Sequence, residues 1–169
     1  MSQTQLMVAH FTANATGGCT RILGVMIPAQ IEKEVLIDAP IDVVWRVITE
    51  PDQIVRWFSD EAHIDLRPGG DGRLVFKGGD SYQLQVEAVE PLRRFAFRWV
   101  QPQGSVARQD NSMLVEFTLE TEGSGTRLRV VESGFDKADW SDEEKARYAE
   151  RHIEGWERLL VRLRDFARR

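Results

Sequence analysis

From residue 61 to residue 134 apolar side chains recur at every second position, which is the period of β-strands with one buried face. Glycine and proline interrupt the pattern at intervals that suit tight turns, so it predicts about six antiparallel strands. The inner face is expected to carry Tyr82, Leu84, Val86, Ala88, Phe95, Phe97, Trp99, Met113, Val115, Phe117, Leu119, Leu128 and Val130. The face toward water is expected to carry Arg94, Arg98, Glu116, Glu120, Arg127 and Arg129.

A further strand and two short helices are predicted before this region. Residues 31–38 are rich in branched aliphatic side chains, and Ala39-Pro40 ends that strand and starts a helix over residues 40–49. Asp38 is the candidate cap of this helix. Glu50-Pro51-Asp52 then breaks the pattern before a second short helix.

The C-terminal region predicts one long helix. Ser141 and Glu144 have the spacing of a capping box, and about 26 helical residues are expected to follow. One apolar stripe, at steps of three and four residues, should pack on the concave face of the sheet; its members are Ala149, Ile153, Trp156, Leu160, Leu163 and Ala167. Gly155 lowers helix propensity by roughly 1 kcal/mol relative to alanine, so we expect it to allow close packing or to leave room for another group.

These elements predict an α+β domain over residues 31–169. It comprises a curved antiparallel sheet of about seven strands, two short helices after the first strand, and a long C-terminal helix across the sheet. Residues 1–30 contain no acidic residue and only one basic residue, and they are expected to form a loosely attached, flexible extension. Met26 is a candidate translation start.

Composition narrows the possible partners. The formal net charge is −5, which disfavours nucleic acid and anionic membranes, and no run approaches the roughly 18 apolar residues of a membrane span. Cys19 is the single cysteine, and His10, His63 and His152 are too scattered for a metal site, so no disulfide, metal or cofactor is expected. A reducing cytoplasm fits this composition best.

Several short motifs together resemble a known family. They are Ala39-Pro40, Val44-Trp45, Trp57-Phe58, Arg67-Pro68-Gly69-Gly70, Val89-Glu90-Pro91, Gly125-Thr126-Arg127-Leu128, Glu132-Ser133-Gly134-Phe135 and Gly155-Trp156. In this order the chain is similar, from residue 31 to about residue 168, to the activator of heat-shock protein 90 ATPase homologue family. This family belongs to the START-like (SRPBCC, Bet v 1-like) helix-grip superfamily. The resemblance implies a helix-grip fold, and an apolar small molecule bound between sheet and long helix.

The inward aromatic side chains could line a ligand cavity or fill it as core. An empty volume of about 300 Å³ would cost roughly 7 kcal/mol at the rate found for core truncations, so we expect a narrow pocket rather than a wide tunnel. The candidate lining residues are Trp45, Trp57, Tyr82, Phe95, Phe97, Trp99, Met113, Val115, Phe117, Glu132, His152, Trp156 and Leu160.

Three polar residues have two readings each. Glu132 continues the inward series, so it either contacts a ligand or lies at a solvated rim where the strand ends or bulges near Ser133-Gly134. Tyr82 is either a core residue with its hydroxyl at the edge or a ligand contact. His152 is either a partly exposed helix residue or a base.

Three functions are compatible with this sequence. The first is binding of an apolar or amphipathic small molecule, with Glu132, Tyr82 or His152 meeting its polar group. The second is an interaction module of a chaperone or stress pathway. The third is a cyclase- or lyase-like enzyme that uses Glu132 or His152 as general acid or base. The oligomeric state is expected to be monomer or homodimer.

Overall fold

The structure is a computed structural model that describes residues 20–22, 25–100, 105, 107–108 and 110–169. The elements follow the chain in this order: β1 (Thr20–Ile22), β2 (Val25–Ile27), β3 (Gln30–Ile37), α1 (Ile41–Thr49), α2 (Pro51–Ile54), β4 (Glu61–Ile64), β5 (Asp71–Val75), β6 (Ser81–Glu90), β7 (Arg94–Val100), β8 (Ser112–Glu122), β9 (Gly125–Ser133), the 3-10 helix η1 (Phe135–Lys137) and α3 (Asp142–Ala167). No helix of this described part is long and apolar enough to cross a membrane.

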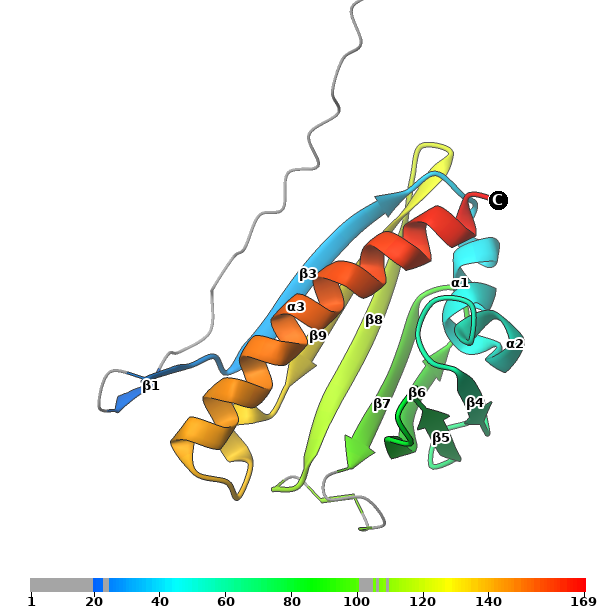
Figure 1. Cartoon of the computed structure of the whole chain (residues 1–169). Helices are drawn as coiled ribbons and strands as arrows, with labels where there is room; N and C mark the ends of the chain where they lie inside the picture. The colour runs from blue at the N-terminus through cyan, green and yellow to red at the C-terminus, as the bar shows by residue number, and fades with distance from the viewer. Residues whose placement is uncertain (1–19, 23–24, 101–104, 106, 109) are drawn as a thin grey trace, which may run out of the picture.

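Seven strands form one antiparallel sheet in the order β3-β9-β8-β7-β6-β5-β4. The first strand, β3, pairs with the last, β9, while β4 to β9 pair in sequence order. Helix α3 lies across the concave face, and α1 and α2 close one end of it (Figure 1). This arrangement confirms the predicted α+β helix-grip fold.

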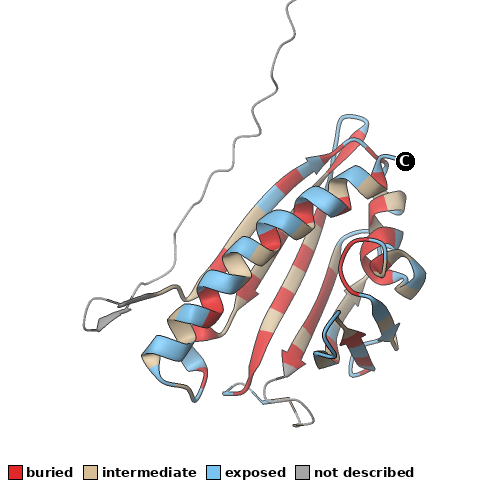
Figure 2. Ribbon diagram, in the orientation of Figure 1, coloured by how far each residue is buried: buried red, intermediate tan, exposed pale blue. Residues whose placement is uncertain are grey.

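Alternate side chains of the strands point inward and fill the space between sheet and helix, as predicted. Buried positions alternate along β8 and β9, and the buried side of α3 faces them (Figure 2). In α3 the stripe is buried at Ala149, Trp156, Leu160, Leu163 and Ala167, and Ile153 packs against the core from a partly buried position.

One inward assignment is wrong. The register of β6 shifts between Val86 and Ala88, so that Ala88 pairs with Ala96 and Val89 pairs with the inward Phe95. A bulge adds one residue to its strand and reverses the alternation beyond it. Val89 therefore packs against the core in place of Ala88.

The predicted cap of the first helix is also wrong. Pro40, not Asp38, is the N-cap residue of α1, and no side chain caps this helix end. The backbone closes the first turn instead, because the Pro40 carbonyl accepts from the N–H groups of Val43 and Val44 at 3.0 and 3.2 Å. By contrast, Ser141 and Glu144 form the predicted capping box at the start of α3.

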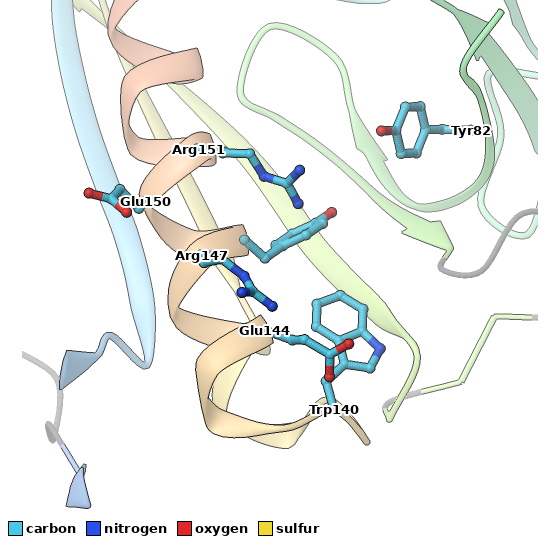
Figure 3. Close-up of a pocket in the computed structure, with 7 residues that line it drawn as sticks. Tyr82, Trp140, Glu144, Arg147, Glu150 and Arg151 are labelled. Atoms are coloured by element: carbon cyan, nitrogen blue, oxygen red, sulfur yellow. The ribbon is translucent and has the colours of Figure 1, made fainter. Parts of the chain in front are cut away.

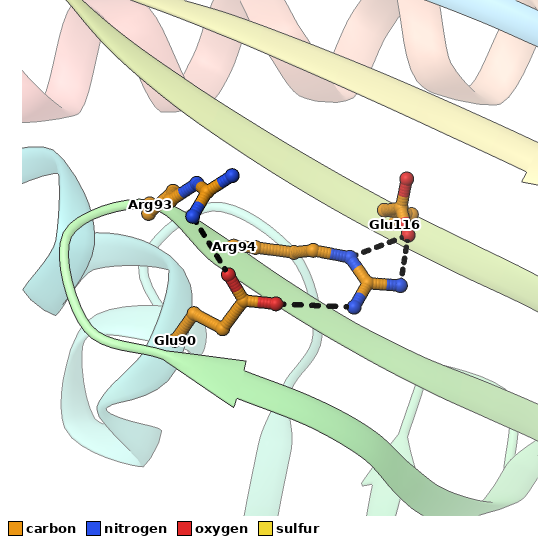
Figure 4. A network of polar contacts seen from close by, with 4 residues as sticks. All are labelled: Glu90, Arg93, Arg94 and Glu116. Carbon is orange, nitrogen blue, oxygen red and sulfur yellow. Dashed lines mark hydrogen bonds and ion pairs between the residues drawn. The ribbon is translucent and has the colours of Figure 1, made fainter.

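The outer face of the sheet carries ion pairs between neighbouring strands. Arg94 donates to Glu116 at 2.7 Å from Nε and also contacts Glu90, which Arg93 approaches as well (Figure 4). Further pairs join Arg98 to Glu87, Arg129 to Glu32, and Arg127 to Glu34 and Glu122. Each such exposed pair contributes about 0–1 kcal/mol, so this face is stabilised modestly and its charges are largely neutralised.

The N-terminal segment lies partly outside the described residues. Residues 1–19 and 23–24 are not described, so the expectation that residues 1–30 form a flexible extension lies mostly outside the described residues. Strands β1 and β2 pair with each other, and β2 contacts α3.

Candidate functional site

A carboxylate lies at the centre of the packed interior. Glu132 stays on a regular strand, because its register neighbours are Val115 on β8 and Ile31 on β3, and its side chain is 0% exposed. The carboxylate of Glu132 therefore lies neither at a bulge nor at a solvated rim, the two positions considered for it near Ser133-Gly134. Three side chains donate to it instead, and together with Glu132 they form what we call the Glu132 cluster: Trp99, His152 and Trp156.

The geometry of this cluster satisfies both carboxylate oxygens. Trp99 Nε1 donates to Oε1 at 2.8 Å, and Trp156 Nε1 donates to Oε2 at 2.8 Å. His152 Nδ1 lies 2.9 Å from both oxygens. An ionised carboxylate can only accept, so an imidazole paired with one donates from Nδ1, and Nε2 is the ring nitrogen that does not contact Glu132.

Aromatic rings enclose the imidazole. Tyr148 stacks on His152 with ring centroids 3.9 Å apart and an interplanar angle of 26°, while Trp99 meets the ring edge-on at 5.3 Å. The His152 side chain is 19% exposed. A carboxylate beside an imidazole is a pair of residues that can perform acid–base chemistry, but the Tyr148 ring covers one face of the His152 imidazole.

The space behind the cluster is filled rather than hollow. A hollow deeper in the core, lined by Trp57, Phe58 and Phe117 among others but by no member of the cluster, measures only about 10 Å³, close to the size of one water molecule. Beside the cluster, aromatic rings pack directly on Trp156, with the centroids of Phe117 and Phe58 each 5.7 Å from that of Trp156. A drug-sized molecule has no room in this position.

A larger opening lies on the other side of Tyr148. This opening, the α3 groove, has a volume of about 610 Å³ and lies between the first turns of α3 and strand β6. Its lining residues are Tyr82, Trp140, Glu144, Arg147, Tyr148, Glu150 and Arg151. Figure 3 shows Arg147 and Arg151 reaching from the helix toward the opening, with Tyr82 facing them from across it.

Tyr148 separates the groove from the Glu132 cluster. Its side chain is 8% exposed, and its hydroxyl has no hydrogen-bond partner in the part of the chain that the structure describes. Burial raises the pKa of this hydroxyl well above its ordinary value, and the nearby Glu132 charge adds to that effect. The group is therefore a neutral donor at physiological pH that still lacks an acceptor.

The structure brings together only some of the residues expected to line a ligand site. Trp99, Glu132, His152 and Trp156 form one cluster, and Tyr82 lines the groove. Trp57, Phe95, Phe97, Met113, Val115, Phe117 and Leu160 are buried core, and Trp45 packs half-buried on α1. No group of three or more residues able to hold a metal ion forms within the described ranges.

Sequence reasoning missed most of the groove. Trp140, Arg147, Tyr148 and Arg151 were not among the candidates. The available signal was helical spacing, since residues 144, 148, 151 and 155 follow one side of the helix beside the apolar stripe. Gly155 lies on that side, and a Cβ added there would meet nothing within 4 Å, so its role is not close packing.

Comparison with known proteins gives consistent matches. A family model described as "Activator of Hsp90 ATPase homolog 1-like protein" matches residues 38–168. CalU16 from Micromonospora echinospora is 29% identical, with 89% of this chain and 82% of that chain covered and a TM-score of 0.63. Protein BH1534 from Bacillus halodurans is 29% identical, with coverage of 82% and 96% and a TM-score of 0.65.

A third solved structure shares the fold. The Aha1 dimer from Colwellia psychrerythraea is 18% identical, with 80% of this chain and 93% of that chain covered and a TM-score of 0.65. That protein is a dimer, while the oligomeric state of this chain stays a prediction. A search of curated proteins found no match.

Proposed function

The chain belongs to the family of Activator of Hsp90 ATPase homolog 1-like proteins, and on that premise we propose that it binds an amphipathic small molecule in the α3 groove. Proteins of this fold family commonly bind ligands. The observation that carries the proposal is Tyr148, an almost fully buried wall residue of the groove whose hydroxyl lacks a partner among the described residues.

The volumes favour the groove over the interior. Small-molecule sites usually measure about 300–1,000 Å³, and the groove lies within this range whereas the interior hollow does not. The aromatic rings of Tyr82, Trp140 and Tyr148 offer apolar contact area to a ligand. The buried Tyr148 hydroxyl is a polar group of this wall that lacks a described acceptor, and small-molecule sites commonly combine apolar walls with a few such polar groups.

Binding of the uncharged fluorescent probe N-phenyl-1-naphthylamine tests this proposal. We expect saturable binding that Trp140→Ala weakens roughly two- to tenfold, the range that corresponds to one aromatic contact of about 0.5–1.5 kcal/mol. Trp45→Ala is the matched control, since Trp45 is also half-buried but lies on α1. Absence of saturable binding, or a loss caused by Trp45→Ala rather than Trp140→Ala, would contradict the proposal.

One observation favours a second function, acid–base catalysis. His152 is oriented by a buried carboxylate in the manner of catalytic bases, so Nε2 would be the ring nitrogen that accepts a proton. Its accessibility can be measured by carbethoxylation with diethyl pyrocarbonate and peptide mass mapping, with the exposed His63 as internal reference. Modification of His152, faster in Tyr148→Ala, supports this function. Full modification of His63 with none at His152 in either protein refutes it.

The alternative of a chaperone or stress-pathway module stays a prediction. Such a module would bind its partner through the exposed outer face of the sheet, whose charges are largely paired within the chain.

A further inference from the structure

The α3 groove contains both acidic and basic residues, but they are not equally available to a ligand. The Glu144 carboxylate is occupied by the N-cap, where it accepts from the Ser141 backbone N–H at 3.0 Å and from the Ser141 hydroxyl at 2.7 Å. Glu150 lies on the opposite side of the helix from Arg151 (Figure 3). The acidic groups of the lining are therefore occupied or directed away.

The basic groups are more available. Arg147 pairs with the exposed Glu143 at 3.1 Å, an interaction that solvent weakens. Arg151 makes no ion pair with any residue in the described part of the chain, and its guanidinium carbon lies 5.9 Å from the ring centroid of Tyr148. An unpaired guanidinium offers five N–H donors and no acceptor.

The charge of Arg151 reaches both walls of the groove. Burial raises the pKa of Tyr148 and of Tyr82, and a carboxylate adds to this effect at each, Glu132 at Tyr148 and Asp80 at Tyr82; Arg151 acts in the opposite direction on both. Tyr82 and Tyr148 come from β6 and α3 and each carries a hydroxyl that can donate. A ligand atom between them would lie near the Arg151 guanidinium and between two hydroxyl donors.

From these contacts we infer that the groove selects amphipathic anions. The apolar, aromatic body of such a ligand would pack against Tyr82, Trp140 and Tyr148. Its carboxylate, sulfonate or phosphate group would accept from Arg151 and the Tyr148 hydroxyl. This inference rests on the proposed binding function and names its ligand class. The ligand is a free molecule rather than an anionic membrane, because the chain carries a net charge of −5 and would be repelled by such a surface.

Two probes with the same apolar body separate this inference from the binding proposal. 8-Anilinonaphthalene-1-sulfonate carries a sulfonate that N-phenyl-1-naphthylamine lacks. We expect the sulfonate to bind about tenfold more tightly at low salt, the size of one charge-assisted hydrogen bond, and the difference to shrink as ionic strength rises. Equal affinities would overturn the anion preference while leaving the binding function intact, whereas failure of both probes to bind would overturn both.

A matched pair of variants locates the effect. Arg151→Gln should weaken sulfonate binding about tenfold and change binding of the uncharged probe less than twofold. Arg162→Gln is the control, because it removes the same charge from an exposed position of α3 that lies about 16 Å further along the helix axis. Equal losses in the two variants would show that the whole-molecule field, not the groove, attracts the anion, and would refute the inference.

Discussion

Replacing Glu132 with glutamine tests the proposed role of the carboxylate in the core. Each oxygen accepts from one indole N–H, of Trp99 or of Trp156. A glutamine amide puts an NH₂ group in place of one oxygen, so one indole then faces a donor. His152 can adapt by moving its proton to Nε2 and accepting at Nδ1, but an indole can only donate. Glu132→Gln therefore leaves one buried N–H without an acceptor.

The expected loss of stability follows from this geometry. A buried donor without a partner costs about 1–3 kcal/mol, and the remaining indole exchanges a charge-assisted bond for a neutral one, which costs about 1 kcal/mol more. Removing a buried charge acts in the opposite direction, but three donors already stabilise that charge. We expect the free energy of unfolding to fall by about 2–4 kcal/mol, out of a typical total of about 5–15.

Urea unfolding followed by tryptophan fluorescence measures this loss. Glu120→Gln is the control, because Glu120 is exposed on β8 and has no ion pair with the described residues, so it should change stability by less than about 0.5 kcal/mol. In a Trp99→Phe background the amide can occupy the Oε1 position without facing a donor. In that background Glu132→Gln should therefore cost about 1–2 kcal/mol less stability than it does in the wild-type protein. Additive effects would refute the argument from the indole donors.

Three further predictions concern the groove and the sheet. Gly155→Ala should raise the free energy of unfolding by about 1 kcal/mol in chemical denaturation, because the new Cβ meets nothing within 4 Å; a loss would reveal a packing role. Tyr148→Phe should raise stability by up to about 1 kcal/mol at pH 7, since it removes a buried hydroxyl that has no partner among the described residues. Because the pKa of Tyr148 is raised in the fold, wild-type stability should also fall as pH rises above about 10, and Tyr148→Phe should flatten that fall in unfolding curves at pH 9–11. The hydrogen bond from Arg129 lowers the pKa of Glu32, so their pair stabilises the fold above pH 4.5 and loses this effect as pH falls below it. Glu32→Gln should therefore be about 0.2–1 kcal/mol less stable than wild type at pH 7 in chemical denaturation, and this difference should be gone at pH 2–3.

The sequence predicts the layers of this fold because periodicity reports burial directly. Alternation along residues 112–133 and the stripe through Trp156 place the right side chains between sheet and helix. The errors come from local backbone events that no side-chain pattern encodes. The bulge before Ala88 reverses an alternation that continues unbroken in the sequence, and Pro40 begins α1 without the expected help of Asp38.

The candidate site was harder to predict because it depends on pairing between distant elements. The parity of Glu132 indicates that it points inward, but nothing in the sequence shows that two indoles and an imidazole, from β7 and α3, converge on it. The groove is harder still. Its walls come from β6, the loop before α3 and α3 itself, and its volume depends on how far these elements stand apart.

The position of Tyr148 connects the binding and acid–base hypotheses. With its ring stacked on His152, the groove is closed toward the Glu132 cluster, and a ligand meets arginine and tyrosine donors but no base. Acid–base chemistry on the same ligand requires this ring to leave His152. That forfeits its ring contacts with His152, Trp140 and Phe135, about 0.5–1.5 kcal/mol each, but releases a hydroxyl buried without a described partner, about 1–3 kcal/mol. The lost ring contacts are somewhat larger than this gain, so the ring leaves His152 only where the ligand supplies contacts of its own. Carbethoxylation of His152 with and without bound probe therefore distinguishes a binding protein, in which the probe protects the imidazole, from an enzyme, in which the probe exposes it.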